Sequence, residues 1–118
     1  MSPSVLVVED DEIMRSLMAD AISLLGVRVT ECATADEAIP ILEGPASILL
    51  VITDIFMPGS MDGLELAKMI WARWPDLPVI ITSGHRSVLD GLPTNAMFLS
   101  KPWTTNLLHH AVRTYLPE

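Results

Sequence analysis

The sequence has one cysteine, few aromatic residues and less than half as many basic as acidic residues. With Cys32 alone, no disulfide can form within the chain, which is typical of a reducing compartment and favours a cytoplasmic protein. Seven Lys and Arg against 15 Asp and Glu leave a formal net charge of −8, which argues against binding to nucleic acids or anionic membranes. No apolar run approaches the roughly 18 residues of a membrane span, and no basic segment precedes the first run as in a signal peptide.

Apolar residues, in contrast, are abundant. Hydrophobic residues make up 50% of the 118 positions and charged residues 19%, a balance typical of a packed globular chain. A chain of this length has room for one core, so we expect a single domain over residues 1–118.

Short apolar runs alternate with longer amphipathic segments. Strands are predicted at 5–8, 27–32, 48–53, 79–82 and 97–99. Helices are predicted at 13–25, after Thr34, at 64–74 and after Thr104 or Thr105. Between 87 and 96, glycine and proline leave room for a short or irregular fourth helix at most. The alternation predicts an α/β fold in three layers, a doubly wound parallel sheet with helices on both faces.

Two of these helices carry specific local signals. The first shows apolar residues at helical spacing, followed by Gly26 as a natural end: Ile13, Leu17, Ala21 and Leu24 or Leu25. The second should begin with a capping box in which Thr34 is the N-cap and Glu37 reaches back. Pro40 removes a hydrogen bond from this second helix, so we expect it to be short or kinked.

Polar side chains follow four of the five predicted strands. These residues are Glu9 and Asp10 after the first strand, Asp54 after the third, Ser83 after the fourth and Lys101 after the fifth. Ligands of open parallel sheets bind beyond the carboxyl ends of the strands. We therefore expect these side chains to meet at one edge of the sheet.

The residue types at this edge indicate phosphoryl chemistry. Grouped carboxylates repel one another unless a cation lies among them, and oxygen ligands without histidine or cysteine favour Mg²⁺ over zinc. With Lys101 and Ser83 beside it, a carboxylate next to such an ion can attack a phosphoryl group, which would give an aspartyl phosphate. His109 and His110 have no third ligand at metal-binding spacing, so we expect them on a helix surface.

The motifs at these strand ends resemble the receiver domain of two-component response regulators. They lie at 7–12 (VVEDDE), 54–58 (DIFMP), 61–63 (MDG), 82–84 (TSG) and 101–102 (KP), and the resemblance runs from about Val5 to Leu116. It implies a flavodoxin-like, five-stranded sheet of order 2-1-3-4-5. Strands one and three then lie side by side, which would bring Glu9, Asp10 and Asp54 together.

The resemblance also implies a phosphoacceptor and a set of metal ligands. Asp54 matches the phosphoacceptor and a ligand of Mg²⁺. Asp10 matches a direct ligand of this ion and Glu9 a ligand through water. The backbone carbonyl of Phe56 matches a further ligand.

Three further residues match the switching part of the family's site. Ser83 matches the switch hydroxyl that moves to the phosphoryl group, and Phe98 matches the aromatic switch position. Lys101 matches the phosphate-binding lysine, whose bond to the following proline, here Pro102, is often cis in this family.

The resemblance implies a phosphorelay function. The domain would accept a phosphoryl group from a sensor histidine kinase or a histidine phosphotransfer protein and then change its affinity for a downstream protein. It would be no enzyme beyond its own phosphorylation and dephosphorylation, and either a monomer or a phosphorylation-dependent homodimer. The chain stops after the last predicted helix, so we expect a single-domain regulator or a receiver cut from a larger protein.

Three alternatives share the fold or the nucleophile. They are a small phosphatase with an aspartate nucleophile, a pseudo-receiver that acts as a phosphorylation-independent scaffold, and a flavin-binding electron carrier. The set of acidic, hydroxyl and lysine residues argues against the scaffold. The electron carrier lacks a Ser/Thr/Gly-rich phosphate loop after the first strand.

Overall fold

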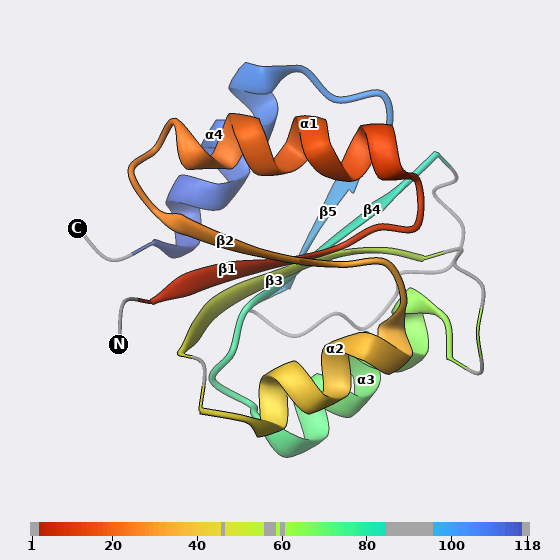
Figure 1. The fold of residues 1–118 in the computed structure, drawn as a ribbon. Coiled ribbons are helices and arrows are strands. Elements are labelled where there is room, and N and C mark those ends of the chain that lie inside the picture. Colours follow the sequence, from red (N-terminus) through yellow and green to blue (C-terminus); the bar gives the residue numbers. More distant parts are fainter. Residues whose placement is uncertain (1–2, 46, 56–58, 60, 85–95, 117–118) are drawn as a thin grey trace.

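Five parallel strands form the centre of the molecule in the order β2-β1-β3-β4-β5 (Figure 1). The computed structural model describes residues 3–45, 47–55, 59, 61–84 and 96–116. The strands are β1 Ser4–Val8, β2 Arg28–Cys32, β3 Ile48–Asp54, β4 Val79–Ser83 and β5 Ala96–Ser100. The predicted order and direction of the strands are confirmed.

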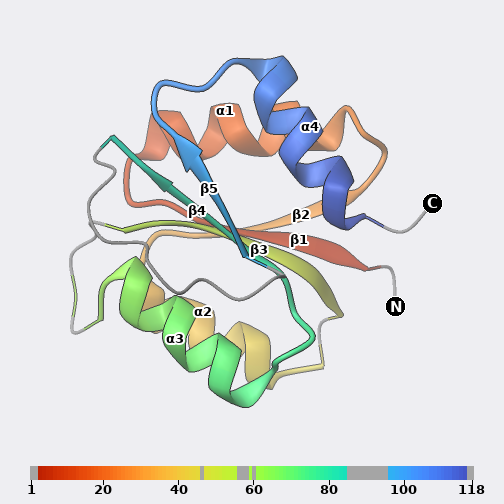
Figure 2. The same cartoon turned by 180° about the vertical axis from the view of Figure 1, so that it is seen from behind.

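Helices cover both faces of the sheet, as predicted. Helices α1 (Glu12–Ser23) and α4 (Thr105–Tyr115) lie on one face, and α2 (Ala35–Glu43) and α3 (Gly63–Arg73) lie on the other (Figures 1 and 2). The short or irregular helix expected between 87 and 96 falls outside the described residues, apart from Ala96, which opens β5. No helix of the described part of the chain is long and apolar enough to cross a membrane.

Local capping residues explain where two of the helices begin. Thr34 accepts a hydrogen bond from the Glu37 N–H at 3.1 Å and caps α2. The Glu37 carboxylate reaches back one residue further than expected and accepts from the Ala33 N–H at 3.2 Å. Pro40 lies inside this helix, which is nine residues long and therefore short, as predicted. Of the two candidate caps of α4, Thr104 is the one that accepts from the Leu107 N–H.

The alternating side chains of the strands build one hydrophobic layer on each face. Leu6, Val8, Val51, Val79 and Ile81 pack with α2 and α3, whereas Val5, Val7, Leu50, Ile52 and Ile80 pack with α1 and α4. Cys32 belongs to the first layer, and burial raises the pKa of its thiol to about 12. At neutral pH this cysteine is therefore a protonated core residue and a poor nucleophile.

Helix α1 carries two different apolar faces. Met18, Ala19 and Ile22 are buried against the sheet. Of the residues whose spacing predicted the helix, Ala21 and Leu25 pack against this core, whereas Ile13, Leu17 and Leu24 are 75%, 56% and 77% exposed. The fold accounts for the first face and leaves the second uncovered.

Candidate functional site

Three carboxylates meet at the carboxyl ends of β1 and β3. Val8 pairs with Thr53 in the register of these neighbouring strands, so the next residues, Glu9 and Asp54, emerge side by side. One carboxylate oxygen from each of Glu9, Asp10 and Asp54 lies within 4.8 Å of the others. This edge of the sheet lies on the right in Figure 1, away from both ends of the chain.

Lys101 reaches into this cluster from the end of β5. Its Nζ lies 3.0 Å from Asp54 Oδ2 and 3.1 Å from Glu9 Oε1. Its backbone N–H donates to the Ser83 carbonyl at 2.9 Å, and the Lys101–Pro102 peptide bond is cis. Although burial lowers it, the pKa of Lys101 is held above its usual value by the hydrogen bonds to Asp54 and Glu9. The ammonium group thus offsets part of the negative charge of the cluster.

Glu9 is the most buried of the three acids, with 1% of its surface exposed. Burial raises the pKa of its carboxyl, against the lowering effect of the Asp11 N–H and of Lys101, while the charge of Asp54 adds to the rise. The carboxylate accepts from the Asp11 N–H at 3.2 Å through Oε2. Its two oxygens are therefore held by different parts of the chain, the N-cap of α1 and the residue after β5.

The start of α3 is pressed against the backbone of Asp54. Gly63 donates its N–H to the Ile55 carbonyl at 2.8 Å, and a Cβ atom at Gly63 would overlap the Asp54 carbonyl oxygen. Asp62 is the N-cap of this helix and forms a full capping box with Glu65. The sequence analysis did not predict this cap. Asp54 itself is 9% exposed and accepts from the Ile55 N–H at 2.8 Å through Oδ1.

The residues expected to act as switches lie on β4 and β5. Ser83 ends β4 and is 1% exposed, whereas the neighbouring Thr82 hydroxyl donates to the Thr53 carbonyl at 3.5 Å. Phe98 is half-buried on β5 and pairs with Ile81, two residues before Ser83. Phe56, the expected source of a carbonyl ligand, lies outside the described residues.

Sequence reasoning missed one basic residue beside the site. Arg15 on α1 donates from Nη1 to the Glu9 carbonyl at 2.9 Å, and its Nε lies 3.6 Å from Glu31 Oε1 on β2. Its position one turn after the acidic stretch was visible in the sequence. A hydrogen bond to a backbone carbonyl, however, leaves no mark in a residue pattern.

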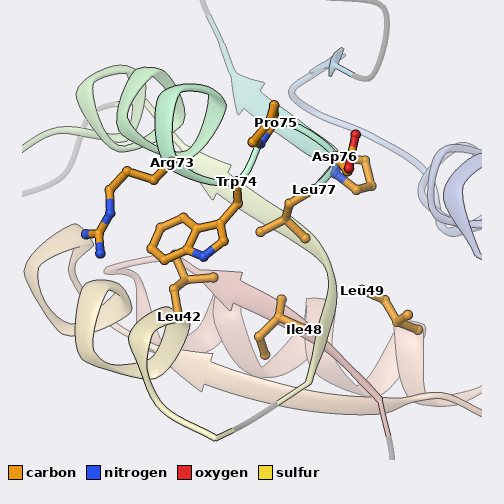
Figure 3. Close-up of a pocket in the computed structure, with 9 residues that line it drawn as sticks. Leu42, Ile48, Leu49, Arg73, Trp74, Pro75, Asp76 and Leu77 are labelled. Atoms are coloured by element: carbon orange, nitrogen blue, oxygen red, sulfur yellow. The ribbon is translucent and has the colours of Figure 1, made fainter.

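The described part of the molecule has a cavity near each end of the sheet. One, of about 540 Å³, lies behind the site and is lined by Lys101, Trp103 and residues of α1 that include Met14 and Leu17. The other, of about 620 Å³, lies at the amino ends of β3 and β4 (Figure 3).

The cavity at the amino ends of the strands is lined mainly by apolar side chains, with Arg73 and Asp76 among them. Trp74 and Leu77 lie on its wall, and the Arg73 guanidinium lies 4.4 Å from the centre of the Trp74 ring. Arg73 is also paired with Glu43 at 2.7 Å, so its charge is neutralised within the chain. The groups capable of phosphoryl chemistry therefore gather at the other end of the sheet.

The donor set of the site fits a hard divalent cation. All three candidate ligands offer carboxylate oxygens, which suit Mg²⁺ rather than zinc. An ion among them would add to the charge neutralisation that Lys101 provides. A carboxylate that is flanked by a cation and an ammonium group can serve as a nucleophile toward phosphorus.

Comparison with known proteins identifies relatives along the whole chain. The sequence matches the model of the response regulator receiver domain over residues 5–113. It is 36% identical over 116 residues to the C4-dicarboxylate transport transcriptional regulatory protein DctD of Rhizobium meliloti (strain 1021), which covers 95% of this chain and 25% of DctD. It is 39% identical over 88 residues to the response regulator protein FleR of Pseudomonas aeruginosa, which covers 75% of this chain and 18% of FleR. The chain thus spans a quarter or less of these two relatives.

Solved structures of receiver domains have the same fold as this chain. A response regulator receiver protein from Sinorhizobium medicae WSM419 superposes with a TM-score of 0.87 at 27% identity, covering 97% of this chain and 94% of that chain. The receiver domain of the hybrid histidine kinase CckA superposes with a TM-score of 0.81 at 33% identity, covering 97% and 99%.

Proposed function

Because the chain belongs to the response regulator receiver domain family, we propose that it accepts a phosphoryl group on Asp54 within a two-component phosphorelay. The observation that carries this proposal is the placement of Lys101, whose Nζ lies 3.0 Å from Asp54 Oδ2 inside the acidic cluster. The match over residues 5–113 supports the further proposal that residues 1–118 form one receiver domain. We place this domain in the cytoplasm, in line with its single buried cysteine.

The proposed cofactor is Mg²⁺. Asp10 and Asp54 would bind it directly, Glu9 would bind it through water, and the Phe56 carbonyl would complete the set. The proximity of three carboxylate oxygens, within 4.8 Å of one another, supports this assignment. When bound, the ion supplies positive charge to the oxygens of the transferring phosphoryl group.

In the proposed transfer, a carboxylate oxygen of Asp54 forms a bond to phosphorus while the bond between phosphorus and the donor's histidine nitrogen breaks. The electron pair of the broken bond stays on the imidazole nitrogen. The Lys101 ammonium, which pairs with Asp54 before transfer, then neutralises a phosphoryl oxygen. Later, attack of water on the same phosphorus breaks the bond from phosphorus to the Asp54 oxygen, restores the carboxylate and releases inorganic phosphate. The domain catalyses only these two reactions of its own side chain and turns over no separate substrate.

The proposed response to phosphorylation begins at Ser83. Its hydroxyl would donate to a phosphoryl oxygen, and Phe98 would follow as the aromatic switch. The Lys101 N–H donates to the Ser83 carbonyl and so links the ends of β4 and β5. Because of this bond, movement of one strand end would displace the other. Such a change would alter the affinity for a downstream protein, with or without formation of a homodimer.

We infer that the protein carrying the phosphohistidine docks on the exposed side of α1. Ile13 and Leu17 on α1 and its C-cap residue Leu24, here called the α1 face, are separated by four and seven residues, which is the spacing of a helix–helix seam. Leu17 and Lys101 both line the cavity behind the site, so the α1 face is continuous with it. Exposed Glu12 and Asp20 lie on the same helix, which favours a donor helix with an apolar seam and basic neighbours.

The test is phosphorylation by a small donor. Incubation with acetyl phosphate and Mg²⁺ followed by intact-mass measurement should show one phosphoryl adduct, which Asp54→Asn abolishes. An adduct that persists in Asp54→Asn, or none in the parent chain, contradicts the proposal. Steady turnover of a generic phosphate ester would instead favour the small phosphatase, and a chain that binds its partner equally with and without acetyl phosphate would favour the scaffold.

A further inference from the structure

Arg15 joins three elements that surround the acidic cluster. Its Nη1 donates to the Glu9 carbonyl at 2.9 Å, just beyond the end of β1. Its Nε lies 3.6 Å from Glu31 Oε1 on β2, and its own backbone N–H donates to the Asp11 carbonyl in the first turn of α1. The Arg15 side chain is 20% exposed, so the guanidinium group lies between these elements rather than in solvent.

The bond from Arg15 satisfies the Glu9 carbonyl, which has no hydrogen bond to a neighbouring strand among the residues that the structure describes. Glu9 still donates its N–H to the Cys32 carbonyl at 3.1 Å, as a continuation of the pairing between β1 and β2. Its carbonyl, in a residue that is 1% exposed, accepts from Arg15 instead of from a strand. Because a buried carbonyl without a partner is costly, Arg15 stabilises this orientation of the peptide.

That peptide sets the direction of a proposed metal ligand. The Glu9 carbonyl and the Asp10 N–H belong to one rigid plane, so fixing the carbonyl fixes the position from which the Asp10 side chain departs. Glu9 has further restraints, because Lys101 and the Asp11 N–H hold its carboxylate. Asp10 is exposed, and within the described part of the chain its carboxylate has no hydrogen-bond partner. The direction of Asp10 therefore depends on the backbone before it.

We propose that Arg15 is a positioning residue of the metal site: it fixes the Glu9–Asp10 peptide so that the Asp10 carboxylate points toward Glu9 and Asp54. The proposal rests on the proposed function, since it assumes that these carboxylates bind Mg²⁺. The guanidinium fork suits this task because two of its nitrogens face different groups, since Nη1 donates to the Glu9 carbonyl and Nε lies 3.6 Å from Glu31 Oε1. A lysine at this position would present a single ammonium group.

A purely electrostatic effect of Arg15 would have the opposite sign. A positive charge near a cation site repels the cation, so removing the charge alone should strengthen Mg²⁺ binding. Loss of positioning should weaken it. The direction of the change in affinity therefore separates the two effects.

The experiment measures the dissociation constant of Mg²⁺ by calorimetry with the full chain, for the parent and the variants Arg15→Ala, Arg15→Lys and Glu31→Gln. Arg15→Ala should raise the dissociation constant about 10-fold, the lower limit found for residues that orient metal ligands. Arg15→Lys should keep most of this defect, and Glu31→Gln, which frees only the second contact, should show a smaller one. Arg28→Ala is the matched control, because Arg28 is an exposed arginine at the other end of β2 and its loss removes the same charge.

Thermal midpoints in EDTA show whether each variant is folded, and any fall in stability is recorded apart from the fall in affinity. At saturating Mg²⁺, the rate of phosphorylation of Arg15→Ala by acetyl phosphate should return to within about twofold of the parent, because positioning affects binding of the ion. An Arg15→Ala dissociation constant equal to or lower than that of the parent overturns the inference and leaves the proposed function standing. If Arg15→Ala does not fold, an unchanged dissociation constant in both Arg15→Lys and Glu31→Gln overturns it. A parent chain that binds no Mg²⁺ overturns the proposed metal site together with this inference.

Discussion

Replacing Lys101 by methionine should destabilise the chain in the absence of metal. The change keeps the aliphatic stem that lines the cavity with Trp103 but removes the ammonium group between Glu9 and Asp54. Breaking a buried ion pair costs about 3–5 kcal/mol, and an exposed pair contributes less than about 1 kcal/mol. The Lys101 side chain is 25% exposed and those of its partners are 2% and 12% exposed, so an intermediate loss of about 2 kcal/mol is expected. For a domain of this size that loss lowers the thermal midpoint by about 8 °C.

The loss should depend on pH because of Glu9. Burial raises the pKa of Glu9, so the folded chain holds this proton more tightly than the unfolded chain does. The resulting contribution to stability is present below the unfolded pKa and is lost as the pH rises through the folded pKa. Lys101 lowers the Glu9 pKa, so removing it raises that pKa further. The difference in stability between Lys101→Met and the parent should therefore be largest near neutral pH and shrink toward about pH 5.

Urea unfolding in EDTA, followed by circular dichroism at about pH 7.5 and about pH 5, measures both effects. Addition of Mg²⁺ at about 100 times its dissociation constant should stabilise the folded variant by up to about 2.7 kcal/mol. A parent-like free energy of unfolding at neutral pH, or a loss that does not change with pH, would refute the role given to Lys101 in neutralising the cluster.

Three further changes test other parts of the structure. Leu17→Asp, on the α1 face, should slow phosphotransfer from a phosphohistidine protein about 10-fold and leave acetyl phosphate labelling unchanged; equal slowing with both donors would argue against docking there. Gly63→Ala should lower the free energy of unfolding by about 3 kcal/mol, because the new Cβ overlaps the Asp54 carbonyl oxygen, and a parent-like urea midpoint would contradict this packing. His109→Ala should cost about 1 kcal/mol by removing the 2.6 Å hydrogen bond from His109 Nε2 to the Ala21 carbonyl, with partial recovery in His109→Gln; identical stability of both variants would show that the bond contributes nothing.

The fold was predictable because its strands are continuous apolar runs with clear ends. The runs beginning at Val5, Ile48 and Val79 are buried on both faces of a parallel sheet, and such strands contrast sharply with the amphipathic helices between them. The order of the strands was less accessible. Alternation predicts a parallel sheet without fixing which strands are neighbours, and the order 2-1-3-4-5 came from the family resemblance.

The sequence predicted which residues lie at the site, but it did not predict which atoms they contact. Asp54 ends a buried strand and Lys101 follows a half-buried one, and the carboxyl ends of parallel strands meet at one edge of the sheet. That Lys101 bridges Asp54 and Glu9 depends on side-chain conformations, which a residue pattern does not record. The contact of Arg15 with the Glu9 carbonyl is less accessible still, because every residue has a carbonyl and only the fold determines which one is left without a strand partner. His109 shows the same limit: expected on a surface, it is half-buried and donates to a carbonyl of another helix.

The exposed side of α1 shows what apolar periodicity leaves open. Apolar spacing indicates that a helix has an apolar side, but it does not say what covers that side. In α1 the sheet covers Met18 and Ile22, whereas Ile13, Leu17 and the C-cap residue Leu24 face outward. Single exposed apolar residues are common on proteins and need no explanation. Three on one side of a helix, beside a cavity that shares Lys101 with the site, support the proposed docking of the phosphohistidine donor there. The sequence pattern of α1 thus combines residues that the fold buries with residues that the proposed docking would cover, and only the structure separates them.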